Sequence, residues 1–317
     1  MKRTLGVLAV LGTLALAGCS SSNGAAAKTD ASGVTKVRMA LNNTPDSIPI
    51  IVAQKQGYFK EQHLDVTTTT LSDITVVPSL LGKQYDVGFT VAPILIRAVS
   101  QGVAAKMIAG NDGDSAEDEG VQMYVGKGIT SIKDLEGKRI GSPTLTGNIN
   151  LATKAWLAKN GVDVSKVQFV QVPTPNMTDQ LKADQIDGAE LQDPFINTAK
   201  ADGLTSLGDP ERALTDDYLG GTYWAASNAW ISSSPKAVSE FRAALKEADD
   251  WIAKNPDQAY QEIADYTKVT VDVAKRSPIA SFTTDVSAAD LKIWGDTMKQ
   301  YGGFTADIDY DTIVAKG

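Results

Sequence analysis

The chain has 317 residues and a formal net charge of −8, and 43% of its residues are hydrophobic. Binding to nucleic acid requires a basic surface, so this acidic balance argues against that class of function. The single cysteine rules out a disulfide within the chain, and at this length one or two domains can each bury a full hydrophobic core.

The N-terminus has the pattern of a bacterial export signal. A positively charged start precedes an apolar run over residues 5–17, which is shorter than the roughly 20 residues of a membrane-spanning helix. The ending Leu-Ala-Gly-Cys resembles a lipobox, which predicts a signal peptide over residues 1–18, lipidation of Cys19 and a lipid anchor on the outer face of the cell membrane. The alternative is an ordinary signal peptide that contains a cysteine. Residues 19–33 are rich in Ser, Ala and Gly and predict a flexible tether.

From residue 34 onward, short apolar strands alternate with amphipathic helices. This alternation predicts a mostly parallel sheet with helices on both faces. We expect residues 34–120 to form the first part of one lobe. Its expected strands are 37–41, 64–70, 85–90 and 105–109, and its expected helices are 48–56, one that ends near 82, and 93–101.

The alternation restarts after an acidic loop, which predicts a second lobe over residues 121–225. Residues 226–317 are expected to return to the first lobe and to be helical after residue 231. Two extended segments, near 121–125 and 222–231, are the expected crossings between the lobes, and two crossings make a hinge. The other expected elements are strands at 139–141, 167–172, 188–191 and 204–207, and helices at 132–135, 148–160, 177–183, 194–201, 236–254, 256–267 and 288–301.

Four segments carry a resemblance to a known family. They read AQKQGYFK at 53–60, GKQYDVG at 82–88, ITSIKDLEGKRIG at 129–141, and DQIDGA at 184–189, followed by Asp193-Pro194. In this order they resemble the substrate-binding proteins of the nitrate, sulfonate, taurine and thiamine-pyrimidine-precursor group of ABC importers, over roughly residues 36–235. The resemblance implies an α/β fold, a two-lobed periplasmic-binding-protein clamshell of type II-like form with two crossover hinge strands.

The resemblance also implies a function. Such a protein captures a small-molecule solute between its lobes and delivers it to an ABC permease with a cytoplasmic ATPase; we expect it to act as a monomer without a cofactor. The alternatives are a binder of a pyrimidine, another aromatic heterocycle or a carboxylate, a sensor without a permease, and a degraded enzyme of the same fold. Pyrimidine-making relatives look to depend on motifs rich in cysteine and histidine. This chain has one of each, so we expect no catalytic site and no metal site.

In open parallel sheets, ligands bind beyond the carboxyl ends of the strands. The loop from Thr144 to Asn148 is the strongest candidate, because it precedes a helix whose free N–H groups favour an oxyanion. In the resembled family the corresponding loop commonly helps to hold the acidic group of the ligand, whereas the alternative here is simple helix capping. The predicted ligand-binding residues are Asn42, Asn43, Thr44, Thr90, Asp112, Thr144, Thr146, Gly147, Asn148, Glu190, Asp193 and Trp224.

The strand-end loops carry no Arg or Lys, whereas Asp46, Asp112, Glu190 and Asp193 are acidic. A carboxylate that faces the solute favours an amine, so an aminosulfonate or an amino-heterocycle fits better than nitrate. The alternative is that Asp46 and Asp193 cap helices and that residues 112–119 form a solvated acidic loop. Trp224 is expected at the second crossing, where it either stacks on a flat solute or fills the hinge.

Overall fold

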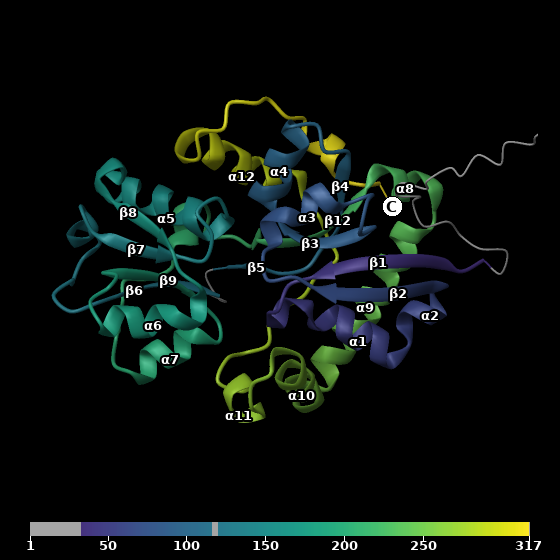
Figure 1. Cartoon of the computed structure of the whole chain (residues 1–317), viewed down its shortest axis with the longest axis horizontal. Helices are drawn as coiled ribbons and strands as arrows, with labels where there is room; N and C mark the ends of the chain where they lie inside the picture. The colour runs from purple at the N-terminus through teal and green to yellow at the C-terminus, as the bar shows by residue number, and fades with distance from the viewer. Residues whose placement is uncertain (1–32, 116–119, 317) are drawn as a thin grey trace, which may run out of the picture.

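The computed structural model describes residues 33–115 and 120–316; the predicted signal peptide, Cys19 and the tether up to residue 32 lie outside them. Within these residues the strands form two five-stranded sheets and one two-stranded sheet. Figure 1 shows the two larger sheets side by side, each with helices on both faces. We call residues 33–112 and 221–316 lobe I, and residues 120–218 lobe II.

Lobe I is built on a sheet of order β2-β1-β3-β12-β4. Strands β1, β2 and β3 are parallel, and β12, which arrives after lobe II, runs antiparallel between β3 and β4. Its elements are β1 (Thr35–Leu41), α1 (Ile48–Gln56), α2 (Tyr58–Glu61), β2 (Leu64–Thr70), α3 (Val77–Leu80), β3 (Val87–Val91), α4 (Ala92–Ser100), β4 (Ala105–Gly110), β12 (Thr222–Ser227), α8 (Asn228–Ser233), α9 (Ala237–Lys254), α10 (Pro256–Thr267), α11 (Val271–Ala274) and α12 (Ala288–Tyr301).

Two apolar clusters cover the two faces of this sheet. On one face α1, α2, α9 and α10 pack together, and on the other α3 and α4 pack with α12 (Figure 1). Trp224 on β12 stands at the centre of the first cluster, edge-on to Phe89 with the ring centroids 5.6 Å apart. The helices of the C-terminal part therefore complete the core that the first part of the chain begins.

Lobe II has the sheet order β10-β6-β9-β7-β8, in which β7, β8 and β9 are parallel and β6 is antiparallel. One face is covered by α5, and the other by α6 and α7 (Figure 1). Its elements are β6 (Val121–Val125), β7 (Arg139–Ser142), α5 (Asn148–Lys159), β8 (Gln168–Gln171), α6 (Thr174–Lys182), β9 (Gly188–Gln192), α7 (Phe195–Ala201) and β10 (Thr205–Ser206).

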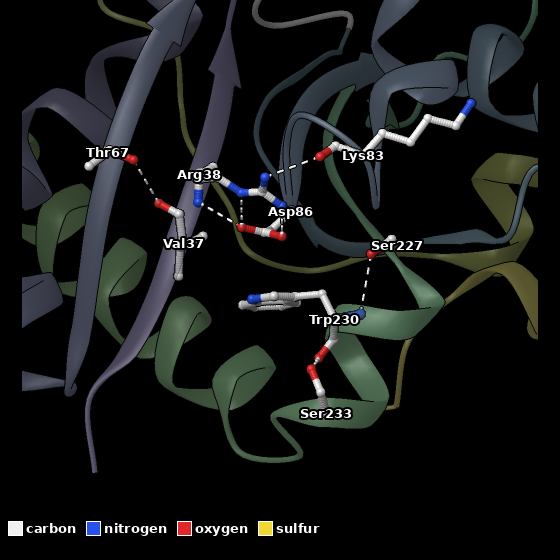
Figure 2. Close-up of polar contacts among 8 residues, drawn as sticks. All are labelled: Val37, Arg38, Thr67, Lys83, Asp86, Ser227, Trp230 and Ser233. Atoms are coloured by element: carbon white, nitrogen blue, oxygen red, sulfur yellow. Dashed lines mark hydrogen bonds and ion pairs between the residues drawn. The ribbon is translucent and has the colours of Figure 1, made fainter. Parts of the chain in front are cut away.

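The two lobes repeat one another at a constant spacing. Arg38 and Asp86 are 48 residues apart and form an ion pair, and so do Arg139 and Asp187. The second pair is shifted from the first by 101 positions (139 − 38 and 187 − 86), and the strand registers around the pairs carry the same shift. Figure 2 shows the first pair, in which the guanidinium lies against the carboxylate and donates to the carbonyl of Lys83. Each ion pair joins two neighbouring strands at the edge where they begin.

The lobes are joined by two short strands, β5 (Gly113–Asp114) and β11 (Leu219–Gly220), which pair antiparallel. A Cβ atom at Gly113 would lie 2.2 Å from the carbonyl oxygen of Leu219, so the close approach requires glycine there. The chain therefore does not cross between the lobes at 121–125 and 222–231, as was predicted, but at β5 and β11. Residues 121–125 belong to the lobe II sheet, and residues 222–227 to the lobe I sheet, because both segments find full strand partners there.

Two further expectations need correction. The extended stretch predicted over 222–231 ends at Ser227, since the Ser227 side chain accepts from the backbone N–H of Trp230 and starts α8. The chain after residue 231 is not helical throughout, because residues 278–287 form an irregular segment that passes the end of β4, where Gly110 donates to the carbonyl of Thr284. No helix in the described part of the chain has the length and apolar character needed to cross a membrane.

Candidate functional site

The loop after β1 is held by its own side chains. Asn42 donates through Nδ2 to Asp46 Oδ2 at 3.2 Å, and Thr44 Oγ1 donates to the same oxygen at 2.8 Å. Asn42 is buried, Thr44 and Asp46 are half-buried, and Asn43 is exposed. The Asp46 carboxylate is thus fixed beyond the carboxyl end of β1 and is partly exposed.

The end of β4 places a second acid beside the first. Asn111 donates to the carbonyl of Asp46 at 3.0 Å and to Thr222 Oγ1 at 3.1 Å. The Thr222 hydroxyl in turn donates to Asp112 Oδ1. Asn111 also accepts from Trp224 Nε1 at 3.0 Å, so the ends of β1, β4 and β12 meet through one amide.

Asp46 and Asp112 form an electrostatically coupled pair. Burial raises the pKa of Asp112 well above its usual range, and the negative charge of Asp46 raises it further. Burial also raises the pKa of Asp46, although hydrogen bonds from Thr44 and Asn42 oppose this effect. The two carboxyl groups lie within hydrogen-bonding reach of each other, so they hold a proton between them more readily than two isolated acids.

Lobe II and the connection add two more acids. Glu211 lies on a short 3-10 helix, Pro210–Ala213, and is 1% exposed. Burial raises its pKa well above the usual range, and the charges of Asp114 and Asp209 raise it further. Asn148 at the start of α5 donates to Glu211 Oε1 at 3.3 Å. Acids from lobe I, from the connection and from lobe II therefore gather at the junction of the lobes.

The loop from Thr144 to Asn148 is tightly built and open at its tip. A Cβ atom at Gly147 would lie 2.3 Å from Thr144 Oγ1, while Thr146 is exposed. The alternative of simple helix capping does not hold, because the N-cap residue of α5 is Gly147 and no side chain caps the helix. The first N–H groups of α5 therefore lack a side-chain cap next to the acids at the junction.

Glu190 lies inside lobe II beneath α5. It is 0% exposed, its Oε2 lies within hydrogen-bonding distance of Ser142 Oγ, and its Oε1 accepts from Asn150 Nδ2 at 3.3 Å. Burial raises the pKa of Glu190 to about 7, although the hydrogen bonds from Ser142 and its other neighbours oppose the effect. In this structure the carboxyl group touches protein atoms on all sides.

Asp193 joins the two lobes. It follows β9, and its Oδ1 accepts from Ser277 Oγ at 2.8 Å and from Asn197 Nδ2 at 3.4 Å. Ser277 belongs to the segment after α11 in lobe I, and its carbonyl accepts from Tyr260 at 3.0 Å. Asp193 therefore makes a contact between the lobes.

Burial argues against two more of the predicted ligand contacts, as it does against a direct contact by Glu190. Trp224 is 0% exposed and packs between Phe89 and Phe241, so it is a core residue of lobe I. Thr90 is also 0% exposed, because β12 covers β3 and pairs Thr90 with Tyr223. Thr90 lies at the end of β3 in sequence, but β12, the strand that carries Trp224, arrives about 130 residues later and pairs beside it.

The structure adds residues that the sequence did not single out. Asp114, Glu211 and Thr222 belong to the junction, but only Asp114 lies near a predicted strand end. Tyr218, just before β11, is 43% exposed and lies close enough to Asp112 and Asp114 to feel their charges. A tyrosine next to a glycine pair gave no signal in the sequence.

A separate hollow of about 560 Å³ lies in lobe I. Its walls come from the second half of α9 and from residues 279–285. None of the junction acids Asp46, Asp112, Asp114 and Glu211 lines it, although the lining residue Thr283 donates to the Asn111 carbonyl at 2.8 Å. Among residues 33–115 and 120–316, no three His, Cys, Asp or Glu side chains are grouped so that they could hold a metal ion.

Comparison with known sequences identifies relatives at low identity. A Brucella abortus (strain 2308) protein, named as a candidate binding protein, is 26% identical over 221 residues, which cover 69% of this chain and 67% of the relative. The Saccharomyces cerevisiae protein THI11, named 4-amino-5-hydroxymethyl-2-methylpyrimidine phosphate synthase, is 27% identical over 251 residues, which cover 73% of this chain and 71% of the relative. Binding proteins and enzymes thus both occur among the relatives.

Solved structures match over nearly the whole described chain. The alkanesulfonate-binding protein SsuA of Xanthomonas axonopodis pv. citri, bound to MOPS, matches with a TM-score of 0.74 at 15% identity, over 89% of this chain and 98% of that one. The nitrate-binding protein NrtA of Synechocystis PCC 6803 matches with a TM-score of 0.69 at 16% identity, over 88% and 85%. The predicted fold is confirmed as the α/β periplasmic-binding-protein fold.

The family is shown by the sequence itself. The "NMT1/THI5 like" family model matches residues 44–259, which is more than half of the 317 residues. The matched region runs from the loop after β1, through all of lobe II, to α10. The chain therefore belongs to the NMT1/THI5-like family.

Proposed function

We propose that this protein is the solute-binding component of an ABC importer, exported and anchored through lipid on Cys19. It binds a small organic solute that carries an amine, between lobes that close about the β5–β11 connection, and delivers it to a permease driven by a cytoplasmic ATPase. The family and the fold of SsuA and NrtA support the binding role. The lipobox pattern supports the anchor.

One observation carries the choice of solute: the acids at the junction come from both lobes and have raised pKa values. Asp46 and Asp112 are half-buried in lobe I, and Glu211 lies in lobe II. A nitrate ion would add a further negative charge to this group. An ammonium or amidinium group would instead offset the charges and let the acids ionise.

The anionic end of a zwitterion has a place at the start of α5. The N-terminus of this 12-residue helix has no side-chain cap and lies behind the Thr144–Asn148 loop. Asn148 bonds to Glu211, so the two proposed half-sites adjoin. The SsuA structure holds MOPS, which carries both an amine and a sulfonate, and this supports a solute of the aminosulfonate class.

A second solute class has one observation in its favour. Tyr218 offers an exposed ring beside Asp112 and Asp114, the arrangement that a flat heterocycle with an amino group would use. The yeast relatives named as pyrimidine phosphate synthases point to the same chemistry. We do not extend their activity to this chain, because its one histidine, His63, stands where β2 begins, at the edge of the sheet opposite to the acids.

The test is a thermal-shift screen of the purified protein. The panel holds taurine, alkane- and arylsulfonates, nitrate, bicarbonate, aromatic carboxylates and aminopyrimidines. A solute at 100 times its dissociation constant adds about 2.7 kcal/mol to the free energy of unfolding, which raises Tm by several degrees in a protein of this size. We expect shifts with the compounds that carry an amine.

Two variants assign the hit to the site. Asp112→Asn should abolish the shift with amines, whereas Asp65→Asn, an exposed acid on β2, should keep it. A shift confined to plain anions would overturn the choice of an amine. No shift across the panel would refute these solute classes.

A further inference from the structure

The repeat between the lobes reveals an anomaly in lobe II. The shift of 101 positions places Ser142 where lobe I has Leu41, and Glu190 where lobe I has Phe89 (142 − 41 and 190 − 89). In lobe I these positions are apolar and fully packed. In lobe II the same positions hold a hydroxyl and a carboxyl group that are 0% exposed.

The covering helices differ in the same way. In lobe I, α1 presents Ile48 and Val52 to this face of the sheet. In lobe II, α5 presents Asn150 and Thr153, both fully buried. Burial of polar groups in place of a hydrophobic core is costly unless they satisfy one another. A polar cluster therefore occupies the part of lobe II where the duplicated fold needs only apolar contacts.

The number of protons available in this cluster indicates that Glu190 is protonated. The Ser142 oxygen lies 3.0 Å from the carbonyl oxygen of Thr144 and within hydrogen-bonding distance of Glu190 Oε2. A hydroxyl has one proton to donate, and the Thr144 carbonyl has none. Both contacts are full two-centre hydrogen bonds at the same time only if Glu190 carries a proton and donates it to Ser142, while Ser142 donates to Thr144.

We propose that Glu190 is a positioning residue that controls the Thr144–Asn148 loop through its own proton. In the protonated state the chain from Glu190 through Ser142 holds the Thr144 carbonyl and with it the turn before α5. When Glu190 loses its proton, Ser142 turns its hydroxyl to the carboxylate and releases that carbonyl. The consequence for solute binding rests on the proposed function, since this loop is the lobe II part of the proposed site.

The surroundings of Glu190 suit such a role near neutral pH. Burial raises its pKa to about 7, against the opposing hydrogen bonds of Ser142 and Asn150 and the positive charge of Lys154 on α5. The Lys154 ammonium also lies over the Phe169 ring, 5.1 Å from its centroid. Opposite Glu190 on β6 stands Met123, which is uncharged. Within residues 33–115 and 120–316, the charged group that acts on the Glu190 carboxyl group is therefore Lys154.

The Thr144–Asn148 loop and the helix that follows it contact other parts of the junction, so a change in the loop can affect them. Its last residue, Asn148, bonds to Glu211, and a Cβ atom at Gly221 would lie 3.4 Å from Asn148 Nδ2. Further along α5, Leu151 and Ala152 pack with α12 of lobe I. The proton on Glu190 therefore acts on a segment that touches both the acids at the junction and the other lobe.

The first test needs no solute. The side-chain carboxyl ¹³C resonance of Glu190, identified by its absence in Glu190→Gln, is followed from about pH 5 to about pH 9. Amide hydrogen exchange of residues 144–148 is measured over the same range. We expect the resonance to titrate near 7, and the protection of these amides to fall about fivefold as it does.

The variants separate this role from a merely structural one. Glu190→Gln keeps a permanent donor to Ser142, so protection should stay high at all pH values. Ser142→Ala breaks the chain, so protection should be low at all pH values. Asp179→Asn, an exposed acid of lobe II, should behave like the unaltered protein. Titration of Glu190 near its ordinary value of 4.5, or equal pH dependence in the Gln variant, would overturn the proposal.

A solute identified by the thermal-shift screen supplies the second test. The affinity of the unaltered protein for this solute should fall several-fold between pH 6 and pH 8. The affinity of Glu190→Gln should fall less over the same range. If the screen finds no solute while the exchange results hold, the proposed function fails and the proton-controlled loop stands. If the affinity depends on pH equally in both proteins, the loop does not govern binding.

Discussion

The duplicated Arg–Asp pairs offer a perturbation with a built-in control. We predict that Arg38→Met lowers the free energy of unfolding by about 3 kcal/mol and that Arg139→Met lowers it by about 1 kcal/mol. Both substitutions keep a long side chain and remove a guanidinium from the same position of the repeat. The difference comes from the partners, since the Asp86 side chain is 0% exposed and that of Asp187 is 24% exposed.

The size of the effect follows from what each variant leaves behind. Arg38 donates to Asp86 twice, at 3.0 and 2.7 Å, and to the Lys83 carbonyl at 3.1 Å (Figure 2). Removing the Arg38 guanidinium leaves the buried Asp86 carboxylate without its cation. Such a loss typically costs about 3–5 kcal/mol when the pair is fully buried. Since the Arg38 side chain is 38% exposed, water replaces part of the interaction, and we take the lower end. In Arg139→Met, by contrast, the Asp187 carboxylate is already 24% exposed, so water can hydrate it.

Urea unfolding measures both values, with the midpoint and the slope analysed separately in case the lobes unfold in two steps. The double variant Arg38→Met/Asp86→Leu should recover part of the loss, because it also removes the buried charge. An Arg139→Met variant that costs as much as Arg38→Met would refute the argument from burial.

Three further outcomes can be checked. Because burial raises the pKa of Glu190 to about 7, the folded chain keeps a proton that the unfolded chain loses above about pH 4.5. The free energy of unfolding should therefore fall by up to about 3 kcal/mol between pH 4.5 and pH 7. Urea titrations of Glu190→Gln over this range should lack that part of the pH dependence. Trp224→Phe leaves a cavity in lobe I and removes the hydrogen bond from Trp224 Nε1 to Asn111, so Tm should fall and the dissociation constant of any solute found, measured by calorimetry, should rise; an unchanged Tm would contradict the place of Trp224 in the core. Ser277→Ala removes a hydrogen bond between the lobes, so stopped-flow measurements should show solute leaving about five times faster, whereas an unchanged rate would mean that Asp193 does not hold the lobes together.

The local signals in the sequence predicted elements well. The helix 48–56 and the strand 64–70 have the bounds that were expected. Gly57 explains the sharp end of the helix, since its φ of 90° is a left-handed conformation that favours glycine. Strand 121–125 was also predicted at its observed bounds. These elements are set by residues that are close in the chain.

The errors concern contacts between distant segments. Trp224 was expected at the hinge because it lies in the stretch 222–231 that was predicted to cross between the lobes, but this stretch forms β12, which inserts between β3 and β4 and buries Trp224. Glu211 was not expected because it lies on a 3-10 helix, and only the meeting of the lobes brings it to Asn148. Periodicity describes the face of one element, whereas a site between two lobes depends on which faces meet.

The position of β12 in the lobe I sheet also decides how the chain can assemble. Lobe II is continuous over residues 120–218 and contains all the strands of its own sheet. Lobe I lacks β12, the fourth strand in the order of its sheet, until the chain has passed through lobe II. Gly220 of the connection forms hydrogen bonds with Tyr223, Asp290 and Trp294, which all come later in the chain. An emerging chain can therefore complete lobe II first, while lobe I and the connection must wait for the last helix.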